Sequence, residues 1–156
     1  MKLLRTTGLS IPFAVLTDGD AQEDGTKAGE RRVLGLMALL VSDEERESTD
    51  DDVLLSIAPN LGLFMGEDTF EMDLFRAGYR ASTCRAIRSL TANRSAAARA
   101  GEKYGWPDSF DAVALLRDIE QIGKGRFAQR MAGEITKDRC PTYIRQGIEY
   151  VANRCT

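Results

Sequence analysis

The chain has 156 residues, of which 43% are hydrophobic and 29% are charged, and its formal net charge is −3. This composition is typical of a single globular domain that is long enough to bury a core. The sequence contains no histidine, which excludes His-based triads, histidine acid–base catalysis and the usual zinc sites. Any catalysis must therefore depend on carboxylates, lysine or a metal ion.

The first expected strand, residues 11–17, is an apolar run that ends at Thr17-Asp18-Gly19-Asp20. Asp18 and Asp20 are one residue apart where this strand gives way to a loop, so both can reach a common cation. Carboxylate oxygens suit hard divalent ions such as Mg²⁺, which usually keep some water for a substrate to displace. Gly19 leaves room for a phosphate to approach. The pattern predicts metal-dependent phosphoryl chemistry.

The remaining elements make the front of the chain α/β and the rest helical. Residues 1–4 are typical of a helix end, the apolar spacing over 27–41 predicts a helix, and the acidic stretch 42–52 predicts a mobile surface loop. Residues 61–65 are expected to form a second short buried strand. Further helices are expected over 69–77, 81–101, 109–121, 124–138 and 141–153, with Asp108 or Ser109 capping the third and Pro141 in the first turn of the last.

A second acidic segment, residues 66–74, follows the second expected strand. Thr69 can cap a helix that has Glu71 and Asp73 in its first turn, and helix dipoles favour acids there without any function. However, loops at the carboxyl ends of parallel strands gather at one edge of a sheet, where ligands bind. We therefore expect the two acidic segments to meet at that edge.

The charges are segregated along the chain. Residues 18–73 contain 16 acidic and 4 basic side chains, whereas residues 76–103 contain 7 basic side chains and a single acidic one. A basic half beside an acidic half suits an enzyme that holds cations and phosphates together. A solvated helix face explains the same arginines without function.

Lys124 lies between Gly123 and Gly125 at an expected helix start. Backbone N–H groups, the positive end of a helix dipole and an ammonium group together form a phosphate ligand. The segment is not a Walker A loop, because the upstream glycine spacing and the Ser or Thr after lysine are missing. A helix break with an incidental lysine remains an equal explanation.

Together these segments resemble the C-terminal Toprim region of OLD-family (overcoming lysogenization defect) ATP-dependent endonucleases. The resemblance covers nearly the whole chain and depends on the order and spacing of the motifs. These are TDGD at 17–20, TFEMDL at 69–74, GKGRFAQ at 123–129 and PTYI at 141–144, followed by Ile148 and Tyr150. The resemblance implies a Toprim-like (Rossmann-like) α/β fold with a small parallel sheet. Residues 1–78 would form a partial Toprim core that carries the metal-binding acids, and 79–156 a helical region that completes the domain.

Carried over residue by residue, the resemblance assigns Asp18, Asp20 and Glu71 to metal binding and Lys124 to catalysis, with Phe70 where the family has leucine. It implies a divalent-metal-dependent DNA endonuclease that uses Mg²⁺ or Mn²⁺, with two ions in the complete site, in phage defence. The implied partners are DNA and an ATPase domain or subunit of the same nuclease, and a homodimer is left open. In the basic half, the candidates for DNA contacts are Arg80, Arg85 and Arg88.

The sequence departs from the family pattern at its start. The first Toprim strand and its metal-binding glutamate should precede Asp18 by several dozen residues, but only 17 residues precede it here and none is acidic. We therefore expect an N-terminally incomplete fold, from a truncated or split nuclease, with weakened or absent activity in this polypeptide alone.

Two other function classes remain open. One is a non-catalytic nucleic-acid-binding or assembly fragment that uses the arginines of residues 76–103. The other is a haloacid-dehalogenase-like phosphatase, in which Asp18 would be the nucleophile, although Gln22 and Met65-Gly66 depart from that pattern. The three scattered cysteines predict reduced thiols in the cytoplasm. We expect neither a signal peptide, because Arg5 interrupts the first apolar residues, nor a membrane span.

Overall fold

The computed structural model describes residues 11–20, 26–105 and 110–155. The chain divides into two compact units, of which the first combines residues 1–70 with 141–156 and the second comprises 71–140. Each unit is described by itself below. The helix end expected at residues 1–4 and the caps expected at Asp108 and Ser109 lie outside the described residues.

The first unit is built on a two-stranded parallel sheet. Strands β1 (Val15–Thr17) and β2 (Leu63–Met65) pair in register, with Val15 opposite Leu63 and Thr17 opposite Met65. This confirms the predicted α/β fold with a small parallel sheet. Both strands are shorter than predicted; before β2, Ala58–Leu61 form a 3₁₀ turn that ends at Gly62 with a φ of 82°. Such a left-handed backbone favours glycine.

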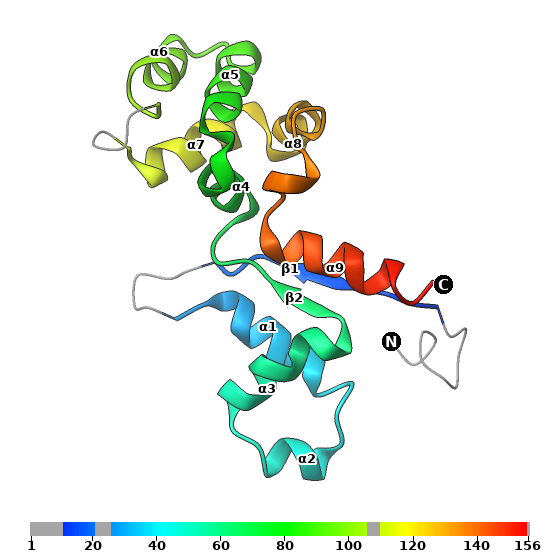
Figure 1. Ribbon diagram of the computed structural model, residues 1–156. Coiled ribbons are helices and arrows are strands. Elements are labelled where there is room, and N and C mark those ends of the chain that lie inside the picture. The colour runs from blue at the N-terminus through cyan, green and yellow to red at the C-terminus, as the bar shows by residue number, and fades with distance from the viewer. Residues whose placement is uncertain (1–10, 21–25, 106–109, 156) are drawn as a thin grey trace. The chain divides into compact units, whose positions relative to one another are not determined.

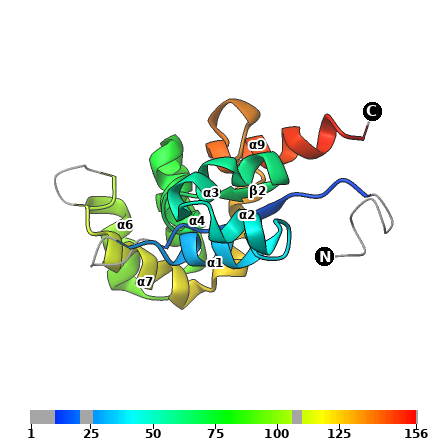
Figure 2. The ribbon, with the colours of Figure 1, turned by 90° about the horizontal axis from the view of Figure 1, so that it is seen from below.

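Helices cover both sides of this sheet. Helices α1 (Ala28–Met37) and α3 (Asp51–Ile57) lie on one side and α9 (Thr142–Ala152) lies on the other (Figure 1). Figure 2 views the first unit from the side of α1 and α3. Val33 and Met37 of α1 pack with Leu54 of α3 and Leu63 of β2 in one buried apolar cluster. Burial of this cluster holds α1 against the sheet.

Helix α9 packs on the sheet through a glycine and an aromatic ring. A Cβ atom on Gly147 would lie 2.5 Å from Cδ2 of Leu16, so the helix approaches β1 closely. The Tyr150 ring meets Phe64 edge-on at 5.6 Å, and its hydroxyl donates to the Asn60 carbonyl at 3.2 Å. The sequence predicted a boundary at residue 78, with α9 in the helical region. In the structure the boundary follows residue 70, and α9 belongs to the unit that contains the sheet.

The mobile loop predicted over residues 42–52 is wrong. Ser42 and Glu45 form a capping box, in which Glu45 N–H donates to the Ser42 hydroxyl and Ser42 N–H donates to the Glu45 carboxylate. This box begins the short helix α2 (Asp43–Glu47). The acids that suggested disorder lie in the first turns of α2 and α3, where the helix dipole stabilises negative charge.

The second unit is entirely helical within its described residues. Its elements are α4 (Phe70–Leu74), which begins at the unit boundary, a wide turn over Phe75–Tyr79, α5 (Arg80–Leu90), α6 (Arg94–Glu102), α7 (Ala112–Ile122), α8 (Lys124–Ala132) and a 3₁₀ turn over Lys137–Arg139.

Single helices over 81–101 and 124–138 are also wrong predictions. The first is divided because the Asn93 side chain accepts from the N–H groups of Ser95 and Ala96 and thereby begins α6. The second stops at Ala132, before Gly133. The cap of α7 is Asp111, whose side chain accepts from Ala114 N–H at 3.0 Å.

A buried polar network joins α6 to α7 in the core of the second unit. Asp118 on α7 is fully buried, and it accepts hydrogen bonds from Arg99 on α6 and from the Tyr104 hydroxyl at 2.6 Å. Burial raises the pKa of Asp118, but the bonds from Arg99 and Tyr104 outweigh burial and hold that pKa below its usual value. Burial also raises the pKa of Tyr104, to about 12.

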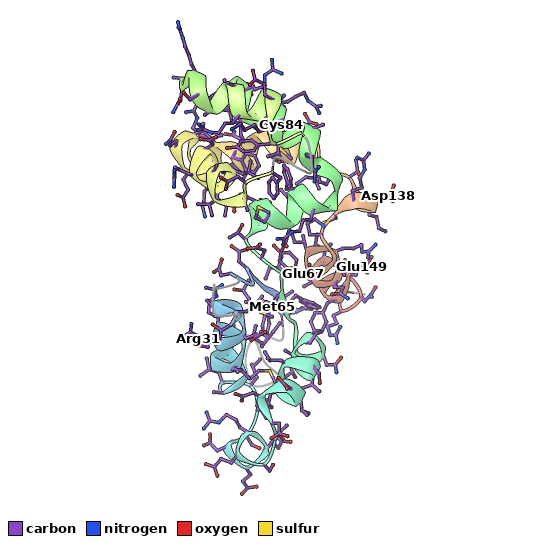
Figure 3. The ribbon with its side chains drawn as sticks, turned by 90° about the vertical axis from the view of Figure 1, so that its left-hand side faces the viewer. Arg31, Met65, Glu67, Cys84, Asp138 and Glu149 are labelled. Atoms are coloured by element: carbon purple, nitrogen blue, oxygen red, sulfur yellow. The ribbon has the colours of Figure 1, made fainter. Side chains whose placement is uncertain are left out.

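All three cysteines are free, with Cys84 buried on α5 (Figure 3), Cys140 half-buried and Cys155 exposed. Across the described residues, no helix combines the length and the apolar character needed to cross a membrane.

Asp118→Asn should lower the free energy of unfolding at neutral pH by about 1–3 kcal/mol, because it leaves Arg99 without its buried carboxylate. The lowered pKa of Asp118 stabilises the wild type above the unfolded-state pKa of about 3.9, and this contribution is lost as pH falls through the folded-state pKa. Urea unfolding of both proteins at neutral and acidic pH should therefore show a difference that shrinks on acidification. A difference that does not change with pH would contradict this role, and Asp138→Asn, at an exposed site, is the control.

Candidate metal-binding site

Residues 18–20, here called the acidic loop, follow β1 directly. Gly19 N–H donates to the carbonyl of Asp68, in the segment that follows β2, at 2.9 Å. Gly66 N–H donates in turn to the Thr17 carbonyl at 2.9 Å. Residues 66–68 therefore meet the acidic loop at the carboxyl edge of the sheet, as the parallel pairing predicts.

The acidic loop packs so closely against its neighbours that it needs glycine. A Cβ atom on Gly19 would lie 2.5 Å from the carbonyl oxygens of both Gly66 and Glu67. Gly29, on the first turn of α1, donates its N–H to the Gly19 carbonyl at 2.9 Å, and a Cβ atom there would strike the Asp18 carbonyl. Gly19 thus serves close contact between loops, in addition to any room that it leaves for a phosphate.

Arg32 on α1 binds the acidic loop and the end of β1 through three acceptors. Its Nη2 donates to the Asp18 carbonyl at 2.7 Å and to Oδ2 of Asp20 at 2.6 Å. Its Nε donates to the Thr17 hydroxyl at 3.0 Å. Arg32 was not among the site residues predicted from the sequence; the available signal was a basic residue within a strongly acidic stretch.

The segment after β2 brings further carboxylates to this edge. Figure 3 shows Met65 and Glu67 where the chain leaves β2, and the Glu67 side chain is exposed. Asp68 accepts the Thr69 N–H through Oδ1 at 2.8 Å. These acids follow the second strand more directly than Glu71, which the sequence analysis selected.

Glu71 lies on α4 in the second unit and is 4% exposed, and its neighbour Asp73 is 7% exposed. The assignment of Glu71 as a metal ligand stays a prediction. Within the described residues, no three Cys, Asp or Glu side chains lie close enough together to hold a metal ion. Mg²⁺ nevertheless commonly binds through one or two carboxylates, with water and substrate phosphate completing its shell. Asp18 and Asp20 are oxygen donors of that kind.

Lys124 is the first residue of α8 and follows Gly123, whose φ of 88° separates this helix from α7. Its side chain is 52% exposed, and Nζ lies 3.9 Å from Oε1 of Glu120, one turn earlier. A surface pair at this distance contributes little to stability. The ammonium group is therefore available for another role.

Two of the three candidate DNA-binding arginines have partners in the second unit. Arg85 donates to the Glu134 carboxylate at 2.6 Å, and the Arg80 guanidinium lies 4.9 Å from the centre of the Phe75 ring. Hydrogen bonds from Ser82 and then Arg85 lower the pKa of Glu134. Arg88 is exposed on α5. Their contact with DNA stays a prediction.

Comparison with known proteins identifies solved structures that have the same fold as this chain. No family model matches the chain, and no curated protein does. The C-terminal region of the Burkholderia pseudomallei OLD protein is 36% identical to this chain and superposes on it with a TM-score of 0.85. The match covers 99% of this chain and 76% of the Burkholderia chain. The C-terminal region of the Xanthomonas campestris pv. campestris OLD protein is 33% identical and superposes with a TM-score of 0.79. That match covers 97% of this chain and 71% of the Xanthomonas chain.

The fold is therefore that of an OLD C-terminal region, with a small parallel sheet and a mostly helical second half. The chain belongs to the OLD family, as its motif order predicts.

Gly29→Ala should lower the free energy of unfolding by about 1–3 kcal/mol, because the new methyl group meets backbone that cannot move aside cheaply. The matched control is Gly35→Ala on the same helix, where nothing lies within 4 Å of an added Cβ. That change should raise stability by up to about 1 kcal/mol through helix propensity. Urea unfolding measures both, and equal effects of the two variants would show that α1 does not touch the acidic loop.

Proposed function

We propose that this chain is the metal-binding, DNA-cleaving region of an OLD-family nuclease, which hydrolyses phosphodiester bonds with Mg²⁺ or Mn²⁺. The observation that carries the proposal is the acidic loop, held at the carboxyl edge of a parallel sheet by backbone bonds from α1 and from the segment after β2. Family membership supports it independently.

In this proposal Asp18 and Asp20 hold the cation, and Glu71 is a further ligand. A bound divalent ion supplies Lewis-acid stabilisation of charge on the scissile phosphate. Lys124 contributes an exposed ammonium group that stabilises negative charge on the same phosphate. Arg88 and its neighbours on α5 bind the DNA backbone, which positions the strand without selecting its sequence.

The proposed partners are DNA and an ATPase domain or subunit of the same nuclease, and a homodimer stays open. The matched relatives are described as C-terminal regions of OLD proteins, which supports a larger assembly for them.

A non-catalytic nucleic-acid-binding role is the second candidate. It is favoured by the basic stretch of residues 76–103, in which Arg88 is exposed on α5. A binding fragment would bind DNA through the arginines of α5 without using a metal ion. No observation favours the phosphatase alternative.

Mn²⁺ should raise the melting temperature of the chain, because a ligand that binds the folded state stabilises it, by about 2.7 kcal/mol at a hundred times Kd. Asp18→Asn and Asp20→Asn should each abolish most of this shift, because each removes a charged oxygen ligand. Differential scanning calorimetry with and without Mn²⁺ measures it.

The matched control for these variants is Asp138→Asn, at an exposed residue of the second unit, which should keep the full shift. A wild type without any shift, or a shift that survives in Asp18→Asn, would refute the metal assignment. DNA binding that persists without Mn²⁺ would then support the second candidate function.

Lys124→Ala should change the free energy of unfolding by less than about 0.5 kcal/mol, since the side chain is largely exposed. In the complete nuclease it should slow DNA cleavage about a hundredfold or more, with Mn²⁺ affinity unchanged, because it removes transition-state charge stabilisation. Single-turnover cleavage and calorimetry separate the two effects.

Lys137→Ala is the control for lost positive charge, since Lys137 is exposed on the 3₁₀ turn after α8. Equal losses of cleavage in both lysine variants would show that Lys124 contributes only non-specific positive surface charge.

A further inference from the structure

We infer that Arg32 is the positioning residue of the acidic loop, and that it sets the affinity of this loop for a divalent cation by holding its backbone and the Asp20 carboxylate in place. The inference deepens the proposed function and rests on it for the identity of the ligand.

The geometry of Arg32 differs from that of an ordinary surface ion pair. One guanidinium reaches three consecutive parts of the chain, namely the Thr17 hydroxyl at the end of β1, the Asp18 carbonyl and the Asp20 carboxylate. The planar arginine fork is well suited to several acceptors in fixed directions, whereas a lysine ammonium is a compact point charge. Arg32 therefore fixes the path of the acidic loop as well as its charge.

The acidic loop has a conformation that requires such support. Asp20 has a φ of 48°, which lies in the left-handed region that non-glycine residues rarely adopt. The Arg32 guanidinium binds the Asp20 carboxylate at Oδ2 and thereby supports this conformation of the loop.

Helix α1 provides a rigid base for Arg32. Val33 and Met37 on the same helix are 2% and 0% exposed, so α1 is anchored in the core of the first unit. The first turn of α1 also binds the loop, through Ala28 N–H to the Asp20 carbonyl at 3.3 Å and Gly29 N–H to the Gly19 carbonyl. Arg32 thus adds a side-chain clamp to a backbone contact made by the same helix.

Arg32 binds Asp20 through Oδ2 and Asp18 through its main-chain carbonyl. A carboxylate can accept from a guanidinium with one oxygen and coordinate a cation with the other. Groups that hydrogen-bond to metal-binding carboxylates typically change metal affinity ten- to a hundredfold. Arg32 can therefore support cation binding by fixing the Asp20 carboxylate in place.

The first experiment needs no metal. Native-state hydrogen exchange at the Gly19 and Gly29 amides reports the two backbone bonds that hold the acidic loop. In Arg32→Ala both amides should exchange about tenfold faster than in the wild type, with exchange at the buried Met37 of α1 unchanged. Arg32→Lys should show a smaller increase, because it keeps the charge but loses the fork.

The second experiment measures Mn²⁺ affinity by titration calorimetry. Arg32→Ala should raise the Kd for Mn²⁺ about tenfold or more, and Arg32→Lys should restore part of the loss. The control is Arg31→Ala; Arg31 lies on the same helix (Figure 3), is exposed and makes no hydrogen bond or ion pair with the described residues. That variant should leave both the exchange rates and the Kd unchanged.

Unchanged exchange at Gly19 and Gly29 in Arg32→Ala would overturn the positioning role. Tighter Mn²⁺ binding in Arg32→Ala would also overturn it, because Arg32 would then compete with the cation for Asp20. A wild type that binds no Mn²⁺ would refute the proposed function and the effect on affinity, while the exchange rates would still decide whether Arg32 positions the loop.

Discussion

The backbone hydrogen bond from Gly19 to Asp68 depends on parallel pairing of β1 and β2, and the candidate site depends on that bond. Parallel pairing places the carboxyl ends of both strands at one edge, so the loops that leave them run side by side. Because these loops approach at backbone distance, one of them must carry glycine at the contact. The acidic residues are therefore positioned by main-chain geometry before any ligand contributes.

The two strands and the acids beside them were predictable because each has a local signal. An apolar run that ends in Asp-x-Asp identifies β1, and a short apolar run before Gly66 identifies β2. The family resemblance followed from the order of such signals, and the structural matches confirm it. Arg32 had only a weak local signal, its positive charge in an acidic stretch, because its three acceptors lie 12 to 15 residues away in sequence and meet it only through the fold.

Helix boundaries were predicted less well, for reasons that particular residues explain. Continuous apolar spacing concealed the break at Asn93, where one side chain satisfies two backbone donors and begins a new helix. The acids of residues 42–52 suggested a loop, although they stabilise the first turns of α2 and α3. Polar residues that terminate or begin helices resemble loop residues when only composition is considered.

The chain order of the first unit has a consequence for synthesis on the ribosome. Helix α9 covers β1 and β2 but follows them after the whole of residues 71–140, which form a unit with a core of their own. During translation the second unit can thus complete its folding while Leu16 and Phe64 still lack the helix that packs on them. Exposed apolar strands in a partly made chain are prone to aggregation. Until residues 142–152 leave the exit tunnel, the sheet therefore lacks the helix that covers one of its sides.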